Sequence, residues 1–428
     1  MDHIGVTKMS NSASIAEASR LWAKIGILSF GGPAAQIALM HREVVDERNW
    51  LTEKQFLNAL SFCMLLPGPE AMQLATYMGW RLHGVMGGLI AGLLFIIPGA
   101  IIIAALAGAY SVWGAMPLAA AVFLGIKATV VVIVIEALLR LSKRALKRID
   151  HWILAAIAFA AIFFLNVPFP LIVLAAGIWG ALNRDKVTED ADVHALHPIK
   201  STGKTILTWL IIWWVPILVL GPLLGQEFLY EIAMFFSKLA VVTFGGAYAV
   251  LAYMGQEVVS VKEWLSAGQM MDGLGLAETT PGPLILVTEF VGFLAGYAQG
   301  GWGMAIAAAT LTLWVTFTPC FLWIFVGAPY IDWIGTQPRL RSALSAITAS
   351  VVGVILNLSV WFALHVFFNN VSPLEKGVLT LWVPEMASLN PIVVILTILA
   401  AYLLLRRHWN VVWVLALSGA LALIAHLL

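Results

Sequence analysis

The chain has 428 residues, of which 61% are hydrophobic and only 11% are charged, and its mean hydropathy is +0.93. Soluble domains carry about 25% charged residues, so this composition excludes a soluble globular protein. The net charge of +1 gives no information on partners, and no basic stripe suited to nucleic acid is present.

Long uncharged runs define the fold class. Asp, Glu, Lys and Arg are absent from residues 82–126, 152–183, 205–226, 290–331, 342–374 and 409–428. Because one span needs about 20 apolar residues, several runs hold more than one helix, and we predict an all-α polytopic membrane protein with about 12–13 transmembrane helices. The opening 20 residues are polar. We therefore expect the first span to act as its own insertion signal, without a cleaved signal peptide.

In chain order, the predicted spans lie near residues 15–40, 84–111, 115–141, 152–166, 168–183, 205–225, 228–250, 300–327, 342–368, 388–405 and 409–428. Shorter apolar pieces flank two Pro-Gly-Pro tripeptides, at 55–66 and 70–81 and again at 269–280 and 284–297. Each pair is predicted to form either a re-entrant hairpin or a single broken span.

One segment is duplicated at an offset of 214 residues. Residues 23–69 align without gaps with residues 237–283, and 16 of the 40 positions from 30 to 69 are identical. A second match places residues 126–139 on 347–360 at an offset of 221. The chain therefore consists of two homologous halves.

The two halves are predicted to have inverted orientations. We assign the first repeat to residues 1–183, a polar linker with one extra transmembrane helix to 184–225, and the second repeat to 226–428. The extra crossing reverses the second copy. Positive residues collect in cytoplasmic loops, and 17 of the 24 Lys and Arg precede residue 205. The basic stretch 140–148 is therefore predicted to be cytoplasmic, and inverted repeats are typical of secondary transporters.

The Pro-Gly-Pro tripeptides are the first candidate site. They comprise Pro67, Gly68 and Pro69 in the first copy and Pro281, Gly282 and Pro283 in the second. Proline removes a backbone donor and interrupts a helix, and the freed groups must be buried in protein or face a wet cavity. A broken helix also directs the positive end of its dipole into that cavity, which suits an anion. A purely structural kink is the alternative.

Paired glycines end the first helix of each copy, as Gly31 and Gly32 in SFGG and as Gly245 and Gly246 in TFGG. They can expose backbone amides to a ligand, although close helix packing explains them equally well.

Charged residues within apolar segments need a reason, because Lys at a bilayer centre costs about 2.5–3.5 kcal/mol on insertion scales. We interpret Lys24, Lys127 and Lys238, together with Arg81, as groups that attract an anion. The alternative for Lys24 and Lys238 is snorkelling to an interface. Glu136 and Arg140 form an i,i+4 pair that we interpret as structural.

Two carboxylates lie beside the tripeptides. Glu70 follows the first and Glu278 precedes the second by three residues, so both are candidates for proton coupling. Pairing with Arg81 or a lysine is the alternative. The amphipathic stretch 41–56 is predicted to be a surface helix or gate that includes Glu43, Arg48 and Trp50.

Motifs for ATP hydrolysis, zinc, haem and redox thiols are absent from the sequence, and Cys63 and Cys320 are isolated. We therefore expect no cofactor, no metal site and no enzymatic activity.

The stretches FGGPxAxI, RExV…RxWLxxxxF, LPGPExxQLAxYxGW and TFGGxYAVL…EVV…WLSxxxxxDGLxLxxxTPGPL closely resemble the bacterial chromate ion transporter (CHR) family. The resemblance covers both halves, as in full-length two-domain members. It implies export of chromate across the inner (plasma) membrane, driven by the proton motive force or by anion exchange, and chromate resistance. Glu278-Thr279 departs from the glutamine-alanine expected there, which bears on substrate or coupling.

Other functions are weighed beside this one. The runner-up is import of sulfate or a related oxyanion, and the others are a membrane enzyme that reduces chromate and a dimerisation or sensor module. The expected partners are a chromate- or sulfate-like oxyanion and membrane lipid, with no nucleic acid, and we allow for a homodimer.

Overall fold

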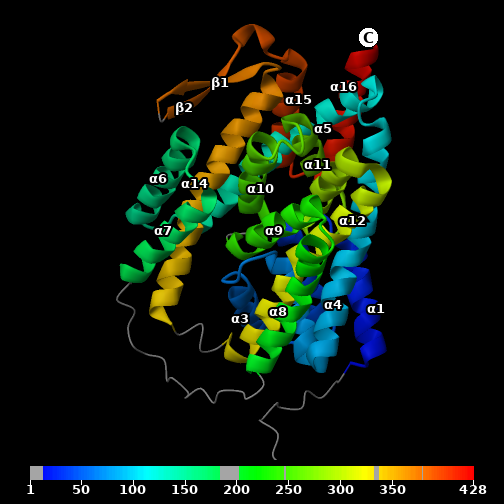
Figure 1. The fold of residues 1–428 in the computed structure, drawn as a ribbon, viewed down its shortest axis with the longest axis vertical. Coiled ribbons are helices and arrows are strands. Elements are labelled where there is room, and N and C mark those ends of the chain that lie inside the picture. Colours follow the sequence, from blue (N-terminus) through cyan, green and yellow to red (C-terminus); the bar gives the residue numbers. More distant parts are fainter. Residues whose placement is uncertain (1–12, 184–201, 245–246, 332–336, 378) are drawn as a thin grey trace, which may run out of the picture.

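The computed structural model describes residues 13–183, 202–244, 247–331, 337–377 and 379–428. Within these residues the chain is a bundle of helices with a two-stranded β-hairpin at one end (Figure 1). This confirms the predicted all-α membrane fold. Helices long and apolar enough to cross a bilayer cover Glu70–Trp113, Pro117–Ala145, Thr202–Leu223, Leu284–Tyr330 and Pro338–Phe367. Residues 184–201, which contain most of the predicted linker, lie outside the described residues.

The helices follow one another through short turns. In the first half they are α1 (Ile15–Leu28), α2 (Gly32–His41), the π-helical turn η1 (Arg42–Asp46), α3 (Glu53–Cys63), α4 (Glu70–Trp113), α5 (Pro117–Ala145), α6 (Ile149–Leu165) and α7 (Phe169–Leu182).

The second half adds α8 (Thr202–Leu218) and η2 (Val219–Leu223) and then repeats the same order. It comprises α9 (Glu227–Val242), α10 (Ala247–Gln256), η3 (Glu257–Val261), α11 (Ala267–Thr279), η4 (Leu284–Leu286), α12 (Val287–Gly327), η5 (Ala328–Tyr330), α14 (Pro338–Phe367), β1 (Val371–Lys376), β2 (Leu379–Pro384), η6 (Met386–Ser388), α15 (Pro391–Ala401), η7 (Tyr402–Arg406) and α16 (Val411–Leu427). The two strands pair antiparallel, with Val371 opposite Pro384.

The predicted spans 15–40 and 228–250 are wrong as single helices, because each is interrupted at its paired glycines. Gly31 adopts φ 83°, a left-handed conformation that ends α1 before α2 begins. In the second copy α9 ends at Val242 and α10 begins at Ala247. Both copies thus place a helix break at the FGG sequence.

Matched side chains start the helix that precedes each Pro-Gly-Pro tripeptide. Thr52 caps α3 and exchanges hydrogen bonds with Gln55, and Ser266 caps α11 and exchanges them with Gln269. These capping boxes satisfy two backbone donors at each helix start. The duplicated sequence therefore sets where α3 and α11 begin.

Long kinked helices follow the tripeptides. Gly84 (φ 63°) bends α4 and Gly301 (φ 66°) bends α12, so each helix consists of a short first arm and a long second arm. The second arms run antiparallel along each other. A Cβ on Gly88 would touch Phe325, whereas one on Gly108 would touch Trp302. This packing supports the predicted inversion of the two halves, which we retain as a prediction.

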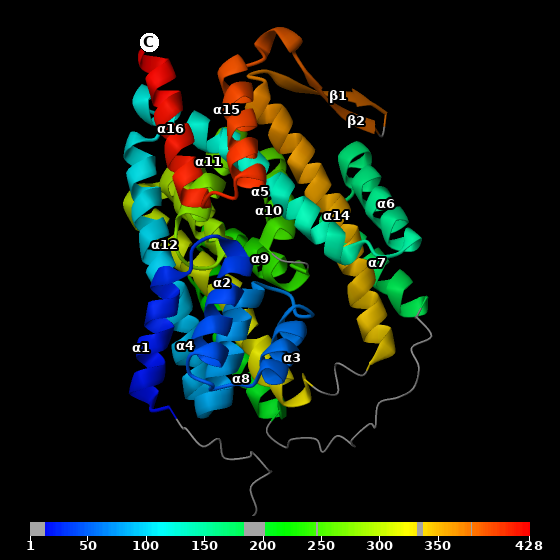
Figure 2. The same cartoon turned by 180° about the vertical axis from the view of Figure 1, so that it is seen from behind.

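The last helix pair of each half packs against the other half. The pair α6–α7 packs on α14, whereas α15–α16 packs on α5, as both views show (Figures 1 and 2). The contacts are close because glycine faces backbone. A Cβ on Gly353 would lie 2.0 Å from the carbonyl oxygen of Ala155, and one on Gly125 would lie 2.0 Å from that of Ser418. The halves therefore interlock.

We predict that Gly125→Ala destabilises the protein by about 1–3 kcal/mol, because the added methyl group meets a backbone carbonyl that cannot move aside cheaply. Thermal unfolding of the purified protein in detergent measures this. Gly203→Ala is the matched control, since a Cβ there has no heavy atom within 4 Å. Equal melting temperatures for the two variants would contradict the interlocked packing.

Candidate functional site

Each Pro-Gly-Pro corner is hydrogen-bonded to the FGG break of the other half. The backbone N–H of Gly68 donates to the carbonyl of Thr243 at 2.9 Å, and that of Gly282 donates to the carbonyl of Ser29 at 2.9 Å. Both glycines have positive φ, 118° and 93°. The breaks in the two copies thus satisfy each other's backbone groups, as a membrane interior requires.

Two glutamines complete the corners. The Gln36 amide donates to the carbonyl of Gly282 at 2.6 Å and to that of Ser29 at 3.1 Å, and Gln36 is buried. The Gln73 amide donates to the carbonyl of Pro67 at 2.7 Å. The corners are therefore held by protein groups and are not simple kinks facing lipid.

A chamber of about 380 Å³ lies beside these corners. Among the described residues, four helices begin at its wall: α2 at Gly32, α4 at Glu70, α10 at Ala247 and α16 at Val411. A helix N-terminus carries a partial positive charge and free N–H groups. Several such ends converging on one chamber make it suited to an anion.

Five acidic or basic side chains line the chamber, namely Glu70, Glu136, Glu278, Arg140 and Arg144. Arg140 forms an ion pair with Glu136 at 2.5 Å. The hydroxyl of Tyr248, at the start of α10, donates to Glu278 Oε1 at 2.8 Å. The chamber therefore combines cationic groups with carboxylates that can accept protons.

A vestibule of about 550 Å³ adjoins the chamber. It shares Glu70 and Arg144 with the chamber wall and adds Lys147, His151 and Arg341. Its basic side chains come from the end of α5, the start of α6 and the start of α14. The cationic side chains in its wall raise the local concentration of anions.

The predicted gate residues form a separate ion cluster. Lys24 bonds Glu43 at 2.6 Å and Arg48 bonds the same carboxylate at 2.7 Å, while the guanidinium of Arg48 lies 5.7 Å from the ring centre of Trp50. The Lys24 side chain is 49% exposed, whereas Glu43 is 1% exposed. The cluster ties α1 to η1, and Lys24 is outside the chamber lining.

The other predicted cations also lie away from the chamber lining. Lys127 pairs with Asp272 at 3.1 Å, and the Tyr110 hydroxyl donates to that carboxylate at 2.7 Å. Lys238 lies 5.6 Å from the ring centre of Tyr253. Arg81 is exposed near the kink of α4. Gly245 and Gly246 lie outside the described residues.

The structure does bring other predicted residues together. Gly31, Gly32, Glu70 and Glu278 all line the chamber, next to the corners at Pro67–Pro69 and Pro281–Pro283. The sequence pattern assigns Arg140 to a structural pair with Glu136, and it places Arg144 in a cytoplasmic stretch beyond the predicted span 115–141. The structure places both side chains in the chamber wall, because α5 continues to Ala145. The available signal for Arg144 was the spacing of 136, 140 and 144, which places three charges on one helix face.

Comparisons with known proteins find relatives over both halves of the chain. A family model described as "Chromate transporter" matches residues 16–181 and 230–423. A chromate transport protein of Pseudomonas aeruginosa is 32% identical over 336 residues, covering 78% of this chain and 77% of that protein. A probable chromate transport protein of Synechococcus elongatus is 29% identical over 343 residues, covering 80% of this chain and 83% of that protein. No solved structure matches the chain.

The ion pair between Lys127 and Asp272 leads to a prediction that tests whether Lys127 stabilises the packing of α5 on α11 or attracts the anion. Lys127→Met leaves a carboxylate that is only 5% exposed without its cation, which costs about 3–5 kcal/mol. Adding Asp272→Asn removes the unpaired charge and restores stability in a thermal unfolding assay.

Transport by the same double variant decides the role of Lys127. A stable double variant that still transports shows that Lys127 is a brace between α5 and α11. A stable double variant without transport would show that the lysine acts on the anion.

Proposed function

Because this chain belongs to the chromate transporter family, we propose that it exports chromate through the chamber beside the Pro-Gly-Pro corners. The chain is a multi-pass protein of the bacterial inner membrane. The convergence of four helix N-termini with Arg140 and Arg144 carries the proposal. Chromate is a tetrahedral dianion, and such oxyanions accept hydrogen bonds from guanidinium and backbone N–H groups.

The carboxylates of the chamber favour a role for protons. With Glu70, Glu136 and Glu278 all ionised, the five charged side chains sum to −1, and a dianion would bring the total to −3. Protonation of Glu70 and Glu278 would make the empty chamber +1 instead. We therefore propose that a proton binds at one or both of these carboxylates when the anion enters.

The membrane potential supplies a driving force for export. Moving one elementary charge through 100 mV is worth about 2.3 kcal/mol, and an interior-negative potential pushes anions outward. A dianion that leaves with a single proton still carries one net negative charge outward. Export driven by the electrical part of the proton motive force, or by exchange for another anion, is thus consistent with the charged groups of the chamber. Resistance to chromate is the expected cellular result.

Direction and substrate are tested in cells that express the protein. Export predicts lower accumulation of labelled chromate than in cells without it, and import would raise the accumulation. The same assay with labelled sulfate separates chromate from sulfate as the carried anion. We propose transport without catalysis, and chromate recovered unreduced outside the cells is the expected outcome.

We predict that Arg144→Gln weakens chromate binding and transport about 10- to 100-fold, the range for loss of a charge-assisted hydrogen bond of about 1.5–3 kcal/mol. Uptake of chromate into inverted membrane vesicles measures it. Lys143→Gln is the matched control, because Lys143 is exposed on the same helix and is outside both cavity linings. Equal loss in both variants would count against a local role for Arg144.

Glu278→Gln tests the proton step. Glutamine keeps an oxygen that accepts from Tyr248 but is permanently neutral, like a protonated carboxyl group. We expect the variant to bind chromate. As pH rises, its affinity for chromate should fall less than that of the parent protein. Chromate's own protonation is common to both proteins and cancels in the comparison. Identical pH profiles would exclude Glu278 from proton coupling.

A further inference from the structure

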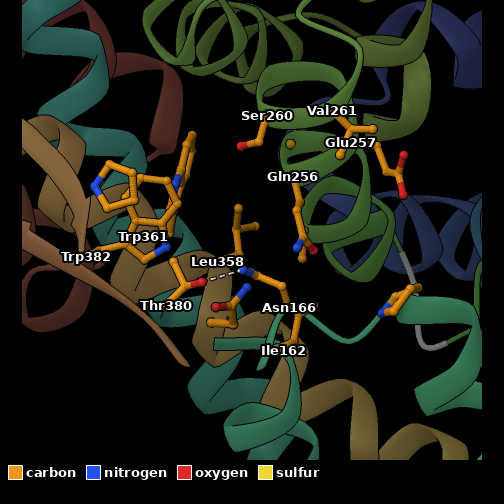
Figure 3. Close-up of a pocket in the computed structure, with 15 residues that line it drawn as sticks. Ile162, Asn166, Gln256, Glu257, Ser260, Val261, Leu358, Trp361, Thr380 and Trp382 are labelled. Carbon is orange, nitrogen blue, oxygen red and sulfur yellow. Dashed lines mark hydrogen bonds between the residues drawn. The ribbon is translucent and has the colours of Figure 1, made fainter. Parts of the chain in front are cut away.

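A second cavity, of about 450 Å³, lies outside the chamber and its vestibule (Figure 3). Its wall is built from the end of α10 with η3, the last third of α14, the turn between α6 and α7, and the β-hairpin. Side chains that can donate hydrogen bonds line it, among them Gln256, Ser260, Asn357, Trp361 and Thr380. The mechanism proposed above does not use this cavity.

The second cavity and the vestibule lie at opposite ends of the same helices. On α14 the vestibule is lined from Arg341 to Thr348, and the lining of the second cavity begins at Asn357. The 9 residues from Thr348 to Asn357 correspond to about 14 Å along a helix. On α6, the vestibule is lined by His151 near the start of the helix and the second cavity by Ile162 near its end.

Internal duplication relates the second cavity to the chamber. At the offset of 221 residues, Asn357 takes the position of Glu136 and Trp361 takes that of Arg140. Glu136 and Arg140 line the chamber, whereas Asn357 and Trp361 line the second cavity. The second copy therefore places neutral side chains where the first copy places an ion pair.

We propose that the second cavity is an oxyanion release site on the membrane face opposite the vestibule. This inference rests on the proposed export of chromate. Neutral donors hold an oxyanion less tightly than guanidinium groups do, and Glu257, which also lines the cavity, repels a dianion. Weak binding at the far side lets the anion leave, whereas the arginines of the chamber capture it from the cytoplasm.

The β-hairpin forms part of the roof of this release site. The side-chain amide of Asn166 donates to the hydroxyl of Thr380 at 2.8 Å, which joins the α6–α7 turn to β2 (Figure 3). Trp382 on the same strand lines the cavity, and its ring lies 5.4 Å from that of His365 on α14. The hairpin is thus attached to both sides of the opening.

Side-specific labelling of cysteine tests the proposal. The starting protein carries Cys63→Ala and Cys320→Ala, so that the introduced cysteine is its single thiol; both native cysteines are buried. This starting protein must itself take chromate into inverted vesicles. Ser260→Cys probes the release site and Ala137→Cys probes the chamber. Each is treated with a membrane-impermeant sulfonate thiol reagent in right-side-out and in inverted vesicles, with and without chromate.

We expect Ser260→Cys to react only in right-side-out vesicles and Ala137→Cys only in inverted ones. Chromate should slow both reactions, and labelled Ser260→Cys should lose transport. Reaction of Ser260→Cys from the cytoplasmic side, no protection by chromate, or full transport after labelling would each overturn the release site. Thr380→Cys, with the same expected pattern, replaces Ser260→Cys if that variant does not fold.

A second variant separates this inference from the proposed function. Asn357→Asp adds a negative charge to the release site. It should lower chromate transport about tenfold, roughly the effect of one unfavourable interaction of 1.4 kcal/mol, while chromate binding to the purified protein stays unchanged. Unchanged transport would refute the release site alone. A starting protein that neither binds nor transports chromate would refute the proposed function itself.

Discussion

A helix that breaks inside a membrane must find hydrogen-bond partners for the backbone groups it frees, because lipid offers none. This chain breaks four times near its centre, at two FGG sequences and two Pro-Gly-Pro corners. Each corner solves the problem with the other half: Gly68 donates to Thr243, and Gly282 donates to Ser29. The breaks can therefore exist only when both copies are folded together, and the exchanged pairs α6–α7 and α15–α16 hold them in that arrangement.

The chamber follows from this constraint. Breaking helices at the FGG sequences and the first corner leaves the starts of α2, α10 and α4 there, and these line one cavity together with the start of α16, which follows the turn after η7. Their partial positive charges add to those of the two arginines on α5, and three carboxylates in the same wall oppose them. In the proposed transport cycle, protonation of these carboxylates would set whether the chamber attracts or repels a dianion, so binding and release would depend on the same charges.

Much of this fold was predictable from sequence, since uncharged runs and the duplicated stretch reveal an all-α membrane protein with two copies of one unit. The Pro-Gly-Pro tripeptides also marked places where helices are interrupted, whereas the predicted spans 15–40 and 228–250 ran through the FGG sequences, where the structure ends one helix before the next begins. The charged residues were harder to place. Lys24 and Lys127 looked like unpaired cations, yet Glu43 and Asp272 neutralise them through contacts between elements distant in sequence. Arg144 looked like part of a loop, yet α5 continues through it. Such pairings depend on tertiary packing, which residue type and local spacing do not specify.

The central claim is that an oxyanion sits in the chamber beside the corners and within reach of Arg140 and Arg144. Anomalous X-ray diffraction at the chromium absorption edge, from crystals of the protein grown with chromate, tests it most directly. The account predicts an anomalous peak inside the chamber, in contact with the starts of α2 and α4. A peak at Lys24 or Lys127 instead, with the chamber empty, would contradict it.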